Sequence, residues 1–159
     1  MSSNSFFVAN FGCRSSQSEG AAVEQELLDG SATPAASAFA ANVVIINTCT
    51  VTEEADREAR QLIRRIATRN PEARVIVTGC YAQRVPDELA ELPGVSHVVG
   101  NSHKPILGKL ALKVLDSDLQ PKERSGRAEV FCSDIFLESE LKPEAHPGSY
   151  FALQSSLTR

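Results

Sequence analysis

The segment NVVIIN at residues 42–47 decides the fold class, because it places four consecutive β-branched residues between two asparagines. An unbroken run of this kind is typical of a strand that is buried on both faces of a parallel sheet. A second run, ARVIVT at residues 73–78, has the same character and is followed by Gly79. We therefore expect two central strands of a parallel sheet in these segments.

The segments on either side extend this pattern into a strict alternation. Shorter apolar runs at 5–11 and 95–99 predict two more strands, and 32–41 is expected to be a loop or a short irregular element. Helical spacing or helix-starting residues occupy the segments that follow the four strands: 17–28, 50–70 with a capping box of Thr50 and Glu53, 86–92, and 102–115. The alternation predicts an α/β fold, an open parallel sheet with helices on both faces.

Composition limits the domain organisation. The chain has 159 residues, of which 42% are hydrophobic, and a formal net charge of −4, which suits one globular domain. We expect this domain to occupy residues 1–117 and residues 118–159 to form an irregular linker with at most one strand. No apolar run reaches the roughly 18–20 residues of a membrane span. The start lacks the pattern of a secretory signal, so we expect a cytoplasmic protein.

The charge is unevenly distributed along the chain. Residues 57–84 contain seven arginines and two acids, a local net charge of +5, so the other residues carry −9. One interpretation is a solvated helix face with ion pairs. The other is a surface that meets an anionic partner, although the acidic chain as a whole is a poor electrostatic match for nucleic acid.

Three cysteines share a position relative to the predicted strands. Cys13, Cys49 and Cys80 each follow a strand, so a parallel sheet brings all three to its carboxyl edge, where open α/β folds bind ligands. Thiolates are ligands of iron–sulfur clusters and of zinc, and three protein ligands leave one metal position open. No local C-x-x-C spacing occurs, so spacing alone leaves buried unreactive cysteines and a zinc-stabilised module as alternatives.

The remaining candidate ligands have weaker patterns. Cys132 lies in the irregular tail and is expected to be a structural thiol, not a fourth ligand. His97, His103 and His146 have no partner in the sequence pattern, and we assign none of them as a ligand or a base. A phosphate-binding loop or an acidic phosphorylation pocket, which a nucleotide-binding or receiver-like α/β module would need, is absent after the first strand.

The segments around the three cysteines resemble the amino-terminal domain of the radical-SAM methylthiotransferases. They read FGCRSSQSEGAAVE, VVIINTCTVTEEADREARQLIRR and VIVTGCYAQRVPDELAELPGVSHVVGNSHK, and together they cover Phe6 to about Lys104. The NTCTVT and TGCYAQ variants most resemble the tRNA threonylcarbamoyladenosine branch. The resemblance implies a flavodoxin-like fold and an auxiliary 4Fe-4S cluster that is held by Cys13, Cys49 and Cys80.

The resemblance also implies a reaction and a partner. Family members of this branch add a methylthio group to threonylcarbamoyladenosine in the anticodon loop of tRNA. The alternatives are isopentenyladenosine in tRNA and an aspartate of a ribosomal protein. The implied partner is tRNA, bound through the complete enzyme, with no membrane and no stable protein partner inferred.

Two departures from the family pattern shape the expectation. Ser16 stands where the family usually has asparagine, and serine can still cap the following helix. The C-x-x-x-C-x-x-C motif of the SAM-cleaving cluster does not occur in the sequence. We therefore expect the second 4Fe-4S cluster and S-adenosylmethionine to bind in a radical-SAM domain outside this sequence. The 159-residue segment alone should be inactive.

Overall fold

The protein forms a six-stranded sheet in which every strand pairs in parallel with its neighbours. The computed structural model describes residues 4–12, 14–48, 52–116 and 127–131. The strand order is β2-β1-β3-β4-β5-β6. The strands are β1 (Ser5–Phe11), β2 (Thr33–Pro34), β3 (Val43–Thr48), β4 (Arg74–Gly79), β5 (Val95–Val99) and β6 (Glu129–Phe131).

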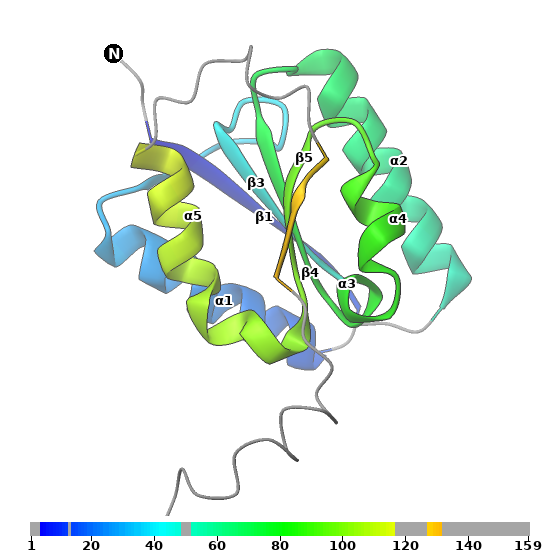
Figure 1. The fold of residues 1–159 in the computed structure, drawn as a ribbon. Helices are drawn as coiled ribbons and strands as arrows, with labels where there is room; N and C mark the ends of the chain where they lie inside the picture. Colours follow the sequence, from blue (N-terminus) through cyan, green and yellow to red (C-terminus); the bar gives the residue numbers. More distant parts are fainter. Residues whose placement is uncertain (1–3, 13, 49–51, 117–126, 132–159) are drawn as a thin grey trace, which may run out of the picture.

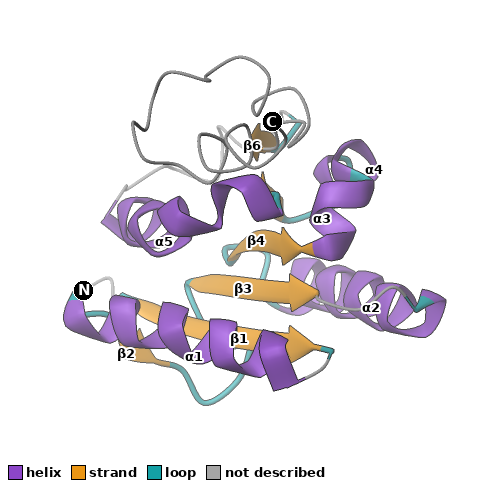
Figure 2. Ribbon diagram, turned by 90° about the horizontal axis from the view of Figure 1, so that it is seen from below, coloured by secondary structure: helices purple, strands orange, loops and turns teal. Residues whose placement is uncertain are grey.

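Helices cover both faces of this sheet (Figures 1 and 2). One face carries α1 (Arg14–Asp29) and α5 (Leu107–Asp116), which is entered through the 3-10 helix η1 (Asn101–Ile106). The other face carries α2 (Glu53–Arg69), α3 (Cys80–Arg84) and α4 (Pro86–Ala90). The predicted α/β fold with helices on both faces is confirmed, and the order of the first five strands is the flavodoxin-like order.

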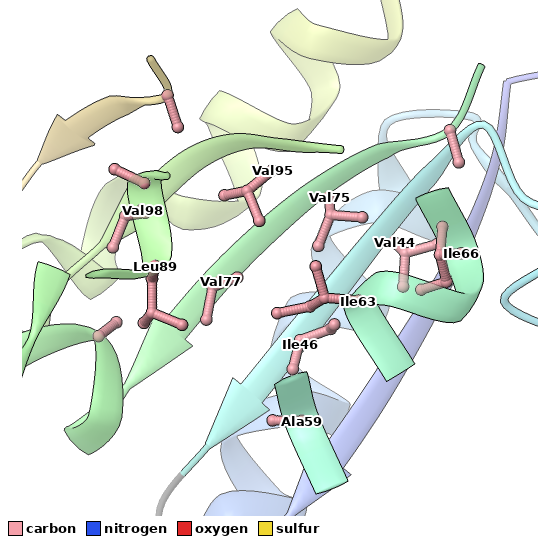
Figure 3. Close-up of a cluster of buried hydrophobic side chains, with 14 of the residues drawn as sticks. Val44, Ile46, Ala59, Ile63, Ile66, Val75, Val77, Leu89, Val95 and Val98 are labelled. Carbon is pink, nitrogen blue, oxygen red and sulfur yellow. The ribbon is translucent and has the colours of Figure 1, made fainter. Parts of the chain in front are cut away.

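The two central strands divide their side chains between two hydrophobic clusters. All six residues of β3 are buried. Ile46 packs with Ile63 of α2 and Val77 of β4 in the cluster shown in Figure 3. Ile45 points to the opposite face and belongs with Leu27 of α1 to the second cluster. A strand that is apolar on both faces therefore has an apolar layer on each side, as its sequence predicts.

The second helix begins later than the sequence pattern indicated. Thr52 is its N-cap, with an extended backbone and a side-chain oxygen that accepts a hydrogen bond from the backbone N–H of Ala55 at 3.4 Å. The predicted capping box of Thr50 and Glu53 is therefore wrong, although Thr50 itself lies outside the described residues. Three acidic residues in the first turn favour a start at Glu53, because they complement the helix dipole.

Two short elements, α3 and β2, were not predicted, and a third, β6, lies in the segment where one strand was allowed for. Residues 80–84 form the helix α3, which Val85 separates from α4 by leaving helical geometry. The strand β2 lies within the expected loop at 32–41, where it extends the sheet beyond β1. The strand β6 lies in the segment expected to be a linker and pairs with β5. Among the described residues, no helix is both long and apolar enough to cross a membrane.

Candidate functional site

The candidate site begins with a row of three residues at the carboxyl edge of the sheet. Phe11 of β1 pairs in register with Thr48 of β3, and Thr48 pairs with Gly79 of β4. Neighbouring strands lie about 4.8 Å apart, so these three chain positions span about 10 Å. The chain passes from β1 outward to β2 and then back across to β3, which makes this edge a topological switch point, where open α/β sheets bind ligands.

Each of the three predicted ligands follows one member of this row. Cys49 and Cys80 come directly after Thr48 and Gly79, and Cys13 comes two residues after Phe11. Cys80 is half-buried and is the first residue of α3. Cys13 and Cys49 lie outside the described residues. The convergence of the three thiols therefore stays a prediction.

Gly79 allows the backbone to approach closely just before Cys80. Its φ angle is +105°, and a β-carbon at this position would lie 2.0 Å from the carbonyl oxygen of Thr48. The Thr48 hydroxyl donates a hydrogen bond of 3.0 Å to the carbonyl of Thr78, which further ties β3 to β4. Only glycine fits this position, so the path of the chain into Cys80 is tightly determined.

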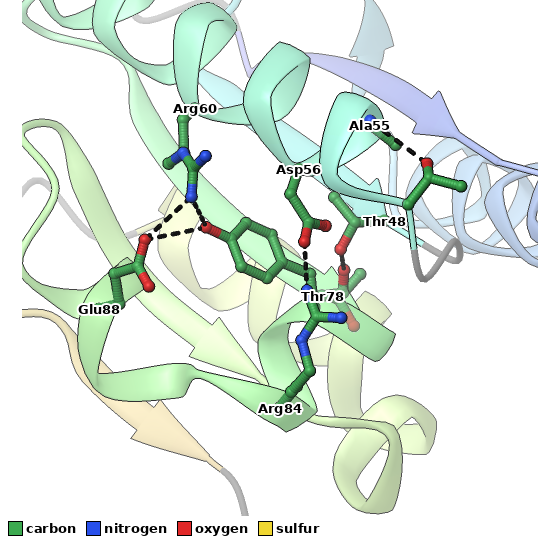
Figure 4. Close-up of polar contacts among 9 residues, drawn as sticks. Thr48, Ala55, Asp56, Arg60, Thr78, Arg84 and Glu88 are labelled. Atoms are coloured by element: carbon green, nitrogen blue, oxygen red, sulfur yellow. Dashed lines mark hydrogen bonds and ion pairs between the residues drawn. The ribbon is translucent and has the colours of Figure 1, made fainter.

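A polar network holds the residue after Cys80 on the α2 side of the sheet (Figure 4). Tyr81 is 2% exposed, and its hydroxyl accepts a hydrogen bond from Arg60 at 2.9 Å and donates one to Glu88 at 3.2 Å. Burial raises the pKa of Tyr81, and the hydrogen bond from Arg60 opposes this effect. Arg84 lies over the ring and forms an ion pair with the buried Asp56. The network joins α2 to α3 and α4.

The same contacts answer part of the question about the arginine-rich segment. Arg60 and Arg84 form ion pairs within the chain, so the ion-pair interpretation holds for them. Arg57, Arg64 and Arg65 are exposed on α2. Arg69 is exposed as well and lies over the ring of Phe39. These exposed arginines form the part of the segment that could meet an anionic partner.

A second polar row lies on the α1 side of the same edge. Asn10, Asn47 and Thr78 are in register on adjacent strands, and the Asn47 amide donates a hydrogen bond of 3.2 Å to Asn10. Asn47 and Thr78 line a cavity of about 320 Å³ between α1 and the segment from η1 to α5. The lining also includes the ion-paired Lys104 and Glu19. The edge therefore has space for a small molecule beside the ends of β3 and β4.

The amide of Asn101 contacts the Cys80 sulfur from the neighbouring strand end. Its Nδ2 donates a hydrogen bond to Sγ over 3.7 Å. The sequence analysis did not identify this residue. The rule that selected the cysteines would have found it, because Asn101 follows the strand at 95–99 just as each cysteine follows a strand.

The two histidines that the structure describes, His97 and His103, contact residues other than Cys80. The Nε2 atom of His97 lies 3.6 Å from a carboxylate oxygen of Glu129, and burial lowers the pKa of His97. His103 lies 2.9 Å from the Ser102 hydroxyl through its Nδ1 atom. Within the described ranges no three His, Cys, Asp or Glu side chains form a group that could hold a metal ion. His146 and Cys132 lie outside those ranges, so the prediction for each stays untested.

Comparison with known proteins gives one matching family and several similar enzymes. The model of the uncharacterized protein family UPF0004 matches residues 5–100, which is more than half of the chain. A threonylcarbamoyladenosine tRNA methylthiotransferase MtaB from Aquifex aeolicus is 47% identical over 102 residues. A tRNA-2-methylthio-N(6)-dimethylallyladenosine synthase from Chlorobium phaeovibrioides is 35% identical over 100 residues. A ribosomal protein uS12 methylthiotransferase RimO from Sorangium cellulosum is 33% identical over 119 residues.

These alignments cover much of this chain and little of each relative. They take in 64%, 60% and 69% of the chain but only 23%, 22% and 23% of the three relatives. The chain thus spans less than a quarter of the length of each of these three relatives.

Proposed function

Because the chain belongs to the UPF0004 family and its relatives are methylthiotransferases, we propose that it is the cluster-binding amino-terminal domain of a tRNA methylthiotransferase. Cys13, Cys49 and Cys80 would hold an auxiliary 4Fe-4S cluster in this domain. The observation that carries the proposal is the register of Phe11 with Thr48 and Gly79. It brings the chain positions just before the three cysteines to one edge of three adjacent strands.

The surroundings of Cys80 fit such a group. The thiol is half-buried, and an amide donates a hydrogen bond to its sulfur. Donors of this kind stabilise the thiolate that an iron–sulfur cluster requires. Gly79 removes side-chain bulk where a cluster would approach the backbone. The hydrogen bonds of Tyr81 anchor α3, the helix that begins at Cys80, to α2 and α4.

The number of protein ligands determines what the cluster and the protein would each contribute. When bound, a 4Fe-4S cluster with three protein thiolates supplies an iron that can accept an external sulfur, the source of the methylthio group. Cys13, Cys49 and Cys80 would hold and orient this group, and the cavity lined by Asn47 and Thr78 could admit a small molecule on the α1 side of the same sheet edge. The chemistry of S-adenosylmethionine and a second 4Fe-4S cluster would belong to the part of the relatives that this chain does not cover.

We propose threonylcarbamoyladenosine in tRNA as the substrate and a cytoplasmic location. The Aquifex relative carries that substrate in its name and is 47% identical to this chain. Isopentenyladenosine in tRNA and a ribosomal protein aspartate remain the alternatives, since relatives with those activities are 35% and 33% identical. The exposed arginines of α2, the helix that follows Cys49, provide positive charge for a tRNA partner.

Anaerobic reconstitution of the 159-residue chain with iron and sulfide tests the cluster. We expect broad visible absorption and about one cluster per chain. Substitution of Cys13, Cys49 or Cys80 by alanine should abolish loading, whereas Cys132→Ala should load normally and serves as the matched control. Tight binding of zinc by a colourless protein would support the zinc module instead. Loss of loading in Cys132→Ala with normal loading in Cys13→Ala would overturn the ligand assignment.

A further inference from the structure

The end of β5 places an amide beside the Cys80 sulfur, and we infer that Asn101 is a positioning residue that tunes the cluster through this hydrogen bond. The inference rests on the proposed function, because it concerns the electronic state of a cluster held by Cys80. Asn101 contributes no metal ligand in this assignment. Its amide instead donates an N–H···S hydrogen bond to one of the ligands.

The strand register explains why these two residues meet. Thr78 of β4 pairs with Val99 of β5. Two residues further along each chain segment are Cys80 and Asn101, whose side chains make the 3.7 Å contact. Across the strand order β1-β3-β4-β5, the positions that follow the strand ends are therefore occupied by three cysteines and then by Asn101. The fourth of these positions therefore holds a neutral amide donor and not a thiol.

Hydrogen bonds on both sides hold the backbone around Asn101. The N–H of Gly100 donates to the carbonyl of Phe131 in β6 at 2.8 Å, and the N–H of His103 donates to the carbonyl of Gly100 at 3.0 Å. The ion pair between Lys104 and Glu19 joins η1 to α1. Contacts with the strand β6 and the helix α1 thus hold the segment that carries Asn101. The Asn101 N–H group therefore points at the Cys80 sulfur already in the absence of a cluster.

The oxygen of the Asn101 side-chain amide gives a second reason to assign a role to this residue. The Asn101 Oδ1 atom is buried and has no hydrogen-bond partner among the described residues. A buried acceptor without a partner costs stability, so such a group in a native protein calls for an explanation. The contact with sulfur supplies one, because the orientation that leaves Oδ1 without a partner is also the one that directs the N–H group at Cys80.

The chemical effect follows from charge. Reduction adds an electron to the cluster, so a donor to a ligand sulfur stabilises the reduced state more than the oxidised state. Loss of the donor should lower the reduction potential of the cluster. Replacement by a carboxylate should lower it further, since a negative charge beside the sulfur disfavours an added electron.

The test compares Asn101→Leu and Asn101→Asp with the parent 159-residue chain after anaerobic reconstitution. We expect a lower midpoint potential in Asn101→Leu and a still lower one in Asn101→Asp, measured by redox titration that is followed by electron paramagnetic resonance. The line shape of the reduced cluster should also change. If the leucine variant does not fold, the aspartate variant has nearly the same size and carries the test.

The matched control is Asn70→Ala at the opposite edge of the sheet. The Asn70 amide also donates one hydrogen bond, to the carbonyl of Ala41 at 3.0 Å, but it lies at the end of α2. This variant should lose stability and keep the parent potential. If a variant at Asn101 binds a cluster and this cluster has the parent potential and line shape, the inference about Asn101 is overturned and the proposed function is not. Failure of the parent chain to load a cluster would instead overturn the proposed function on which the inference rests.

Discussion

The two edges of the sheet differ in how they satisfy their polar groups. At the amino edge, the Ser5 hydroxyl donates to Asn42 at 2.6 Å, and the Ser5 N–H donates to the same oxygen at 3.1 Å. At the carboxyl edge, the buried Thr78 Oγ1 and Asn101 Oδ1 atoms have no hydrogen-bond partner within the described part of the chain. The cysteines follow the strands at this second edge.

This difference between the two edges assigns them different roles, one in stability and one in function. Hydrogen bonds at the amino edge connect the starts of β1 and β3 and add to stability. Unsatisfied buried atoms at the carboxyl edge cost stability, so each of them calls for an explanation, and a binding or redox role is one. One edge of this sheet therefore supports the fold, and the other carries the candidate site.

The largest expected effect is that of Gly79→Ala at the carboxyl edge. The new β-carbon would collide with the Thr48 carbonyl at a φ angle of +105°, so we expect a loss of about 3 kcal/mol or more in the free energy of unfolding. Urea unfolding measures this loss. The control is Gly94→Ala, where φ is +83° but the closest atom, the β-carbon of Ala67, lies at 3.3 Å. A loss of about 1 kcal/mol is expected there, and equal losses in both variants would contradict the role of the close approach.

Asn42→Ala tests the amino edge, where the polar groups are hydrogen-bonded. It removes the acceptor for both Ser5 donors, so we expect a loss of about 1–2 kcal/mol in the free energy of unfolding. Cluster loading should not change, because Asn42 lies at the far end of β3 from Cys49. Parallel urea unfolding and reconstitution measure the two quantities. Lost loading in a variant that remains folded would show that the edges are not separable.

Thr78→Val tests the carboxyl edge, and here the substitution should not lower the stability. Valine has nearly the shape of threonine, and the hydroxyl that it removes is buried without a partner among the residues described. We expect an unchanged or higher free energy of unfolding, by up to about 1 kcal/mol. Chemical unfolding again provides the measurement. A clear loss of stability would mean that the hydroxyl is satisfied, and the contrast between the edges would weaken.

The smallest effect concerns His97, which lies away from both edges on β5. Burial holds the pKa of His97 below its ordinary value of 6.5 in the folded state. The unfolded chain therefore binds a proton more readily, and this residue's contribution to stability is present above pH 6.5 and declines as the pH falls through that value. The parent should lose stability between pH 7 and pH 5, and His97→Gln should lose less. Identical pH profiles in thermal unfolding would contradict this assignment.

Local sequence patterns predicted much of the fold. The runs at 42–47 and 73–78 are apolar on both faces, and such strands are stable only with helices on both sides of a parallel sheet. The same reasoning predicts that the cysteines lie at one edge, because parallel strands all end on one side; the structure confirms the parallel strands and describes only Cys80 of the three. Helix boundaries were less accurate: several residues near 50 can act as caps, and the structure selects Thr52.

The sequence by itself determined the α/β alternation and the place of each cysteine after a strand, since both depend on neighbours in the chain. Only the tertiary structure decided which distant side chains contact Cys80 and its neighbour Tyr81. Arg60, Tyr81 and Glu88 meet because α2, α3 and α4 pack on one face of the sheet. Asn101 reaches the sulfur because β5 pairs with β4 in one particular register. Such contacts depend on packing and strand register, and no local spacing of residues encodes either.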